Sequence, residues 1–157
     1  MSLPQNQTTQ IQPVQPATAT PVPPAEPHKP RPLAEIIKDL SRKLNPQRLA
    51  TKTIPGNNGK QGFSCQYLPW HQCVQYLDNY APGWSYRIIS TQVVGDNFVM
   101  TVSITIVCAE GEVTRDASAL EPIVTKGGFG DCATNVESAA LRRAAAKFGL
   151  ALYLYEK

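Results

Sequence analysis

The segment WSYRIISTQVVGDNFVMTVSITIVCAEGEVTRDASA, residues 84–119, carries the clearest fold signal in this chain of 157 residues. Residues 84–94 are rich in β-branched and aromatic side chains, and residues 95–97 (GDN) are typical of a turn. Apolar and hydroxyl-bearing residues then alternate, as in a strand with one buried and one wet face; the apolar set is Phe98, Met100, Val102, Ile104, Ile106 and Cys108. Residues 110–111 (EG) predict a second turn before a third strand over 112–119. The segment therefore predicts a three-stranded antiparallel β-meander.

Upstream of the meander, the sequence predicts two helices and one short extra strand. Apolar residues recur with helical spacing over 33–44 before Asn45-Pro46 ends the pattern; they are Leu33, Ile36, Ile37, Leu40 and Leu44. Residues 62–68 predict the short strand. A second helix begins at Pro69 and ends at residues 81–83 (APG); its packed face is expected to carry Trp70, Cys73, Val74 and Leu77.

Downstream of the meander, a glycine-rich loop at residues 126–130 leads into a last helix. Thr134 and Glu137 have the spacing of a capping box at its start. The helical period places an apolar stripe on one side of this helix; the stripe comprises Leu141, Ala145, Phe148 and Leu152. The fold class is α+β, with the helices covering one face of the meander. A short sheet with two free edges also favours an oligomer.

Residues 1–32 form a different kind of segment, which contains nine of the fourteen prolines and five glutamines. No aromatic residue precedes Phe63. Such a composition cannot build a core, so we expect a disordered tail over 1–32 and one folded domain over 33–157. The tail is interpreted as either a passive extension or a docking strip for another protein.

The net charge is only +3, but the basic residues are concentrated in two places. Six basic residues and one acid lie between residues 38 and 60, and Arg142, Arg143 and Lys147 lie together on the last helix. The helical period predicts a cationic ridge opposite the apolar stripe, with Arg142 on its flank. If this ridge faced Arg48 and Lys52 across a cleft, the two would form a phosphate-binding groove; the alternative is an ordinary solvated face.

The sequence offers little to support catalysis or metal binding. His71 is the single histidine of the predicted domain, and the four cysteines have no C-x-x-C spacing, so neither a general base nor a zinc site is indicated. The loop at 126–130 lacks the order of an ATP-binding phosphate loop. We therefore expect no enzyme, metal or cofactor. No signal peptide or membrane-length apolar run is present, which favours a cytoplasmic, nucleoid-associated protein.

Two stretches resemble a known family. YLPWHQCVQYLDNYAPGWSYRI (67–88) and ESAALRRAAAKFG (137–149) are similar to the annealing domain of the Rad52 family of recombination proteins and of its bacterial DdrA-like relatives. The most specific parts are the Gly-Trp-Ser before the first meander strand and the Leu-Arg-Arg-Ala-x-x-x-Phe-Gly pattern of the last helix. The resemblance extends over most of residues 44–157.

The resemblance implies a ring-forming subunit whose sheets pair with those of its neighbours and which holds single-stranded DNA in a basic groove. The inner-groove basic pair of the family falls on Arg142 and Arg143. A further groove arginine falls on Lys52, which keeps the charge but loses the bidentate fork. A second, outer DNA site would lie near Lys126. Because the sequence ends at Lys157, directly after the last helix, we expect no C-terminal bracing segment, and ring size is not predicted.

The sequence thus predicts a protein of DNA repair or recombination that binds single-stranded DNA and anneals complementary strands without ATP. The predicted DNA-binding residues are Arg142, Arg143, Lys52, Arg48, Lys147 and Lys126. The expected partners are single-stranded DNA, further copies of the chain in a ring, and a repair protein bound through the N-terminal tail. Two alternatives stay open, namely protection of DNA ends without annealing and a structural oligomer that uses its tail as a docking peptide.

Overall fold

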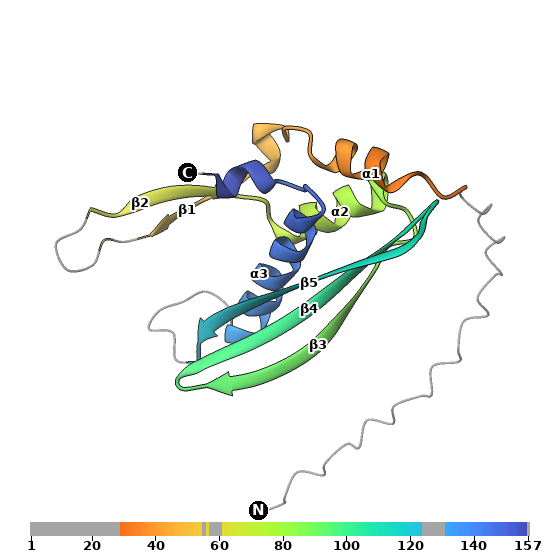
Figure 1. Ribbon diagram of the computed structural model, residues 1–157. Helices are drawn as coiled ribbons and strands as arrows, with labels where there is room; N and C mark the ends of the chain where they lie inside the picture. Colours follow the sequence, from red (N-terminus) through yellow and green to blue (C-terminus); the bar gives the residue numbers. More distant parts are fainter. Residues whose placement is uncertain (1–28, 55, 57–60, 124–130, 157) are drawn as a thin grey trace, which may run out of the picture.

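The computed structural model describes residues 29–54, 56, 61–123 and 131–156, and it confirms the predicted α+β class. Helices and two antiparallel sheets alternate along these residues (Figure 1). The elements in chain order are α1 (Leu33–Leu40), a 3-10 turn (Pro46–Arg48), β1 (Ala50–Ile54), β2 (Phe63–Tyr67), α2 (Trp70–Tyr80), β3 (Ser85–Val94), β4 (Asn97–Cys108), β5 (Gly111–Pro122), α3 (Cys132–Lys147) and a 3-10 turn (Leu152–Tyr155).

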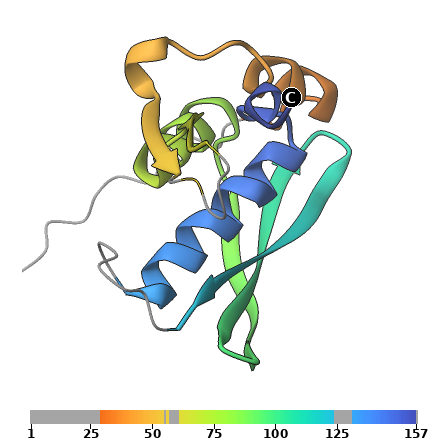
Figure 2. The same cartoon turned by 90° about the vertical axis from the view of Figure 1, so that its left-hand side faces the viewer.

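The predicted meander is the sheet β3-β4-β5, and α3 crosses one of its faces (Figure 2). The alternating residues of β4 face this helix, and Val102, Ile104 and Ile106 are fully buried. The helix meets them with small side chains, among them Ala140 and Ala144, which are also fully buried. Alanine favours the helical state and lets a helix approach a sheet closely. The core therefore lies between α3 and strands β4 and β5, with α1 and α2 stacked beyond it.

Strand β3 is not covered in this way, because α3 packs on β4 and β5. A bulge lies between Ile88 and Ser90, so both Ile88 and Val93 pair with residues on the helix side of β4. Even so, Ile88 is 47% exposed and Val93 is 62% exposed. In the described part of the structure, the outer strand β3 therefore presents an open apolar face, on which Ile88 and Val93 are exposed.

Strands β1 and β2 form a separate antiparallel hairpin that projects from the body of the molecule (Figure 1). Sequence patterns predicted only the second of these strands. The Thr-Lys-Thr-Ile run of residues 51–54 carries the missed signal, since three of its four residues are β-branched. The register pairs Lys52 with Cys65 and Ala50 with Tyr67, so these side chains share one face of the hairpin.

The boundaries of two helices differ from the sequence predictions. Helix α1 ends at Leu40, and Leu44 is buried from the loop that follows. The cap of α3 is Asp131, whose side chain accepts a hydrogen bond from the backbone N–H of Thr134, so the predicted Thr134–Glu137 capping box is wrong. Glu137 instead accepts a hydrogen bond from the hydroxyl of Tyr86, and burial together with this contact raises the pKa of Tyr86 to about 12.

The ordered contacts begin before the predicted domain boundary. Arg31 donates to Asp39 at 2.5 Å, and its guanidinium lowers the pKa of that carboxyl. The backbone N–H of Ala109 donates to the carbonyl of Arg31, which joins this segment to the end of the meander. The rest of the predicted tail, residues 1–28, lies outside the described residues. Within the described part of the chain, no helix has the length and hydrophobicity needed to span a membrane.

Helix α3 ends in a turn that requires glycine. Gly149 has a φ of 98°, its N–H donates to the carbonyl of Ala146, and the N–H of Leu150 donates to that of Ala145, which is the Schellman pattern. A Cβ at Gly149 would lie 2.1 Å from Oγ of Ser41 and 3.4 Å from the carbonyl oxygen of Ile37. The turn thus brings the end of α3 directly against the end of α1. Because the helix ends at Lys147, Leu152 is 47% exposed and is not part of the packed stripe.

We expect Gly149→Ala to destabilise the fold more than Gly83→Ala. Both positions have a positive φ, but a Cβ at Gly83 meets nothing within 4 Å, whereas one at Gly149 collides with α1. The additional loss in the free energy of unfolding should be about 1–3 kcal/mol, the usual cost of overpacking. Urea denaturation of both variants measures the difference. Equal losses would show that the close approach to Ser41 contributes nothing.

Candidate nucleic-acid interface

Arg142 lies where α3 passes the base of the hairpin. Its guanidinium carbon is 5.3 Å from the centroid of the Tyr67 ring, a cation–π contact. It is also close enough to Cys73 to oppose, by its charge, the burial that raises the pKa of that thiol to about 12. Arg142 therefore joins the last strand of the hairpin, the first turns of α2 and the middle of α3.

Lys52 belongs to the same face of the hairpin as Tyr67 and is exposed. Phe63 and Ile54, which are paired at the far end of the hairpin, continue this face and are 52% and 36% exposed. We call Lys52, Phe63, Tyr67 and Arg142 together the Arg142 surface. It combines positive charge with aromatic rings, the two features with which proteins hold single-stranded nucleic acid.

Arg48 lies apart from this surface, over α2. Its guanidinium donates to the side-chain carbonyls of Gln72 at 2.7 Å and Gln75 at 3.0 Å. Neutral amides leave the charge of Arg48 uncompensated. Arg48 ends the 3-10 turn and Lys52 lies in β1, so the two cations that the sequence grouped together come from adjacent elements.

The cations around α3 and the hairpin have no carboxylate partner within 4 Å among the described residues. All ion pairs found among the described residues involve Asp39 or Glu35 of α1, which bind Arg31 and Arg42. Unneutralised charges that are grouped beside aromatic rings can bind an anion without first losing an internal partner.

Arg143 and Lys147 lie on a different flank of α3, over the free edge of β5. Arg143 donates to the backbone carbonyl of Ser118 at 3.0 Å, and Lys147 donates to that of Asp116. Arg115 adds a third cation, since it donates to the carbonyl of Lys147 and lies 4.6 Å from the centre of the Phe148 ring. We call these three cations the β5-edge surface. A shallow recess beside it is lined by Leu152 and Tyr155.

The single cationic ridge predicted for the last helix is therefore divided. Arg142 turns toward the hairpin, whereas Arg143 and Lys147 turn toward β5, where they occupy carbonyl oxygens that the edge strand would otherwise leave unpaired. Consecutive residues are separated by about 100° around a helix, so a close pair in the sequence need not share a surface. Lys126, the sixth predicted residue, lies outside the described residues.

Sequence reasoning missed Arg115 and the exposed aromatic residues of this region. No local sequence pattern marked Arg115 as part of a cationic surface, because its partners lie more than thirty residues away, at the end of α3. Trp70 was predicted to pack in the core with the rest of its helical stripe, yet 51% of its surface is exposed. No group of three or more metal-ligating side chains is present in the described part of the chain.

Comparison with known proteins identifies the family of this chain. The profile of the Rad52/22 family of double-strand break repair proteins matches residues 33–157. The chain belongs to the Rad52/Rad22 family.

Within the Rad52/Rad22 family, the similar proteins include two from Arabidopsis thaliana. The mitochondrial DNA repair RAD52-like protein 1 is 33% identical over 129 residues, which cover 81% of this chain and 69% of the relative. The chloroplastic DNA repair RAD52-like protein 2 is 31% identical over 129 residues, which cover 81% of this chain and 62% of the relative. Membership of the Rad52/Rad22 family supports a role in DNA repair and recombination.

Proposed function

We propose that this protein binds single-stranded DNA and promotes the annealing of complementary strands without ATP. The observation that carries the proposal is the Arg142 surface, where cations without carboxylate partners among the described residues lie beside the half-buried ring of Tyr67 and the exposed ring of Phe63. Membership of a repair family and the DNA-repair names of the two relatives support the same conclusion.

The mechanism is electrostatic. Each phosphate bound by Lys52 or Arg142 releases condensed counterions, so binding is favoured at low salt and does not depend on base sequence. Neutralising the backbone also lowers the repulsion between two strands that approach each other. No covalent step and no nucleotide hydrolysis is required, so the protein acts as a binding platform and not as an enzyme.

We further propose that the subunits assemble through the sheet. The open apolar face of β3, with Ile88 and Val93, gives a second copy a surface to cover. In a closed ring, one side of each subunit meets a different side of its neighbour. The Arg142 surface and the β5-edge surface lie on different flanks of α3. Such an interface can therefore place the Arg142 surface of one subunit beside the β5-edge surface of the next, so that Arg143 and Lys147 contact the same DNA strand.

We expect the wild-type protein to anneal complementary oligonucleotides in the absence of ATP, and Arg142→Ala to slow annealing and weaken binding. Removing a charge-assisted hydrogen bond to phosphate should lower the affinity for single strands by at least about tenfold. The slope of log affinity against log salt should become less steep by about 0.7 for each phosphate that is no longer neutralised. Fluorescence anisotropy gives the affinities, and the quenching of paired dyes gives the annealing rate.

Arg87→Ala is the matched control, because Arg87 is an exposed arginine of β3 that pairs with Ser103, away from the helix side of the sheet. Arg87→Ala should leave both the annealing rate and the affinity for single strands nearly unchanged. Binding that is strong but produces no annealing would favour the alternative of DNA-end protection. Wild-type affinity that does not respond to salt would exclude the electrostatic mechanism.

We expect Val93→Lys to reduce the size of the assembly. Burying a lysine in an apolar subunit interface is costly, whereas the same change at Leu120, which is 58% exposed on the other sheet face, should have little effect. Light scattering after gel filtration measures the mass of the assembly formed by each of the two variants. If Val93→Lys leaves the mass of the wild type unchanged, the open face of β3 is not the subunit interface.

A further inference from the structure

Trp70 is exposed at a position where the helical pattern predicts burial. It lies four residues before Val74 and seven before Leu77, which is the spacing of one helical stripe, and Leu77 is fully buried. Trp70 nevertheless keeps 51% of its surface exposed, although Leu68 before it and Cys73 after it are buried in the core. The largest apolar side chain of the helix therefore contributes only part of its area to folding.

The other tryptophan has an ordinary structural role, which makes the contrast informative. Trp84 is half-buried against the core, and its indole N–H donates to Asp78 at 2.7 Å. For Trp70, the ring contact found among the described residues is with His71, at 6.0 Å between centroids and at an angle of 88°. This edge-on contact restricts the indole without covering it.

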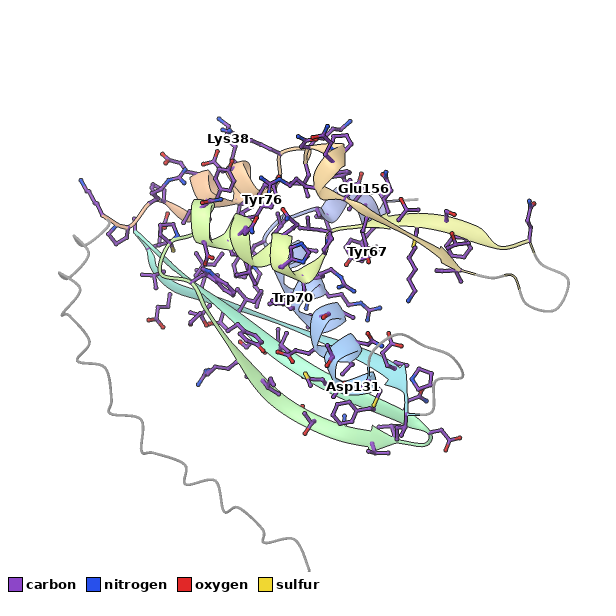
Figure 3. The ribbon with its side chains drawn as sticks, turned by 180° about the vertical axis from the view of Figure 1, so that it is seen from behind. Lys38, Tyr67, Trp70, Tyr76, Asp131 and Glu156 are labelled. Carbon is purple, nitrogen blue, oxygen red and sulfur yellow. The ribbon has the colours of Figure 1, made fainter. Side chains whose placement is uncertain are left out.

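The surroundings of Trp70 are aromatic and positively charged. Tyr67, three residues earlier, carries the guanidinium of Arg142 against its ring, and the charge of Arg142 also reaches Cys73, one turn further along α2. Figure 3 shows Tyr67 and Trp70 near each other, where the hairpin leads into α2 beside α3. Arg48 lies on the other side of α2, because Gln72 and Gln75, which accept its hydrogen bonds, are about 200° and 140° around the helix from Trp70. The cation near the exposed indole that is able to bind a flanking phosphate is therefore Arg142.

We infer that Trp70 is a base-stacking platform, on which one base of a single strand packs while Arg142 and its neighbours hold the flanking phosphates. This inference rests on the proposed function and adds to it a contact made with the base. Stacking uses the flat face of a base and is tolerant of sequence. It leaves the Watson–Crick edge free, so a stacked base can still pair with an incoming strand. A contact of this kind combines binding with annealing, whereas hydrogen bonding to the edge would prevent pairing.

The direct test compares Trp70→Leu and Trp70→Phe on two ligands of equal length, an oligothymidine and an abasic oligomer with the same phosphates. Loss of one stacked base should weaken oligothymidine binding by Trp70→Leu roughly 5- to 150-fold. Trp70→Phe, which keeps an aromatic ring, should retain much of the affinity. On the abasic oligomer, the wild type and both variants should bind alike, because only phosphate contacts remain. Thermal unfolding of each variant verifies that it is folded.

Intrinsic fluorescence gives a second readout that does not depend on a change in affinity, because the chain contains only two tryptophans. In Trp84→Phe, where Trp70 is the fluorophore, oligothymidine should quench the emission strongly and the abasic oligomer should not. In Trp70→Phe, where Trp84 is the fluorophore, neither ligand should change the emission appreciably.

The failures of the two proposals are distinguishable. If Trp70→Leu binds oligothymidine as tightly as the wild type, or loses the same factor on both ligands, Trp70 does not stack on a base and the inference is wrong, while the proposed function stands. If the folded wild-type protein binds neither ligand at low salt, the proposed function fails and the inference fails with it.

Discussion

The close packing of α3 on strands β4 and β5 is the constraint that determines where the cations of this molecule lie. Small, fully buried alanines fix the rotation of the helix about its own axis, because a turn of even one residue would push Arg143 or Glu137 into the sheet. With that rotation fixed, Arg142 can only face the hairpin and α2, and Arg143 and Lys147 can only face the edge of β5. The distribution of charge is a consequence of core packing.

This arrangement separates two tasks. The Arg142 surface offers cations without carboxylate partners among the described residues, together with one exposed and one half-buried aromatic ring, which suit a flexible polyanion with aromatic bases. The β5-edge surface covers carbonyl oxygens of an edge strand, which protects that edge from indiscriminate pairing. The open face of β3 stays available for a specific contact. In the proposed function, the Arg142 surface holds the strand and the open face of β3 meets a neighbouring subunit.

Sequence patterns predicted the parts of this fold that depend on local periodicity. The alternation in residues 98–108 and the turns around it identified the meander, since each strand residue has only two faces on which to lie. The division of the basic ridge could not be predicted from the sequence, because it depends on which neighbours α3 meets. The capping box was wrong because Asp131, one position before the helix, competes as a cap and Glu137 finds Tyr86 across the fold. The exposure of Trp70 was missed because spacing along one helix does not reveal which of its residues meet a neighbouring element.

We propose that single-stranded DNA lies along the flank of α3 that carries Arg142. Photo-crosslinking with an oligonucleotide containing 4-thiothymidine, followed by mass spectrometry of the peptides, locates the bound strand. We expect adducts concentrated in the segment that runs from β2 into the first turns of α2, with Tyr67 or Trp70 as the modified residues. Adducts confined to β5 and to residues 152–155, beside Arg143 and Lys147, would contradict this proposal.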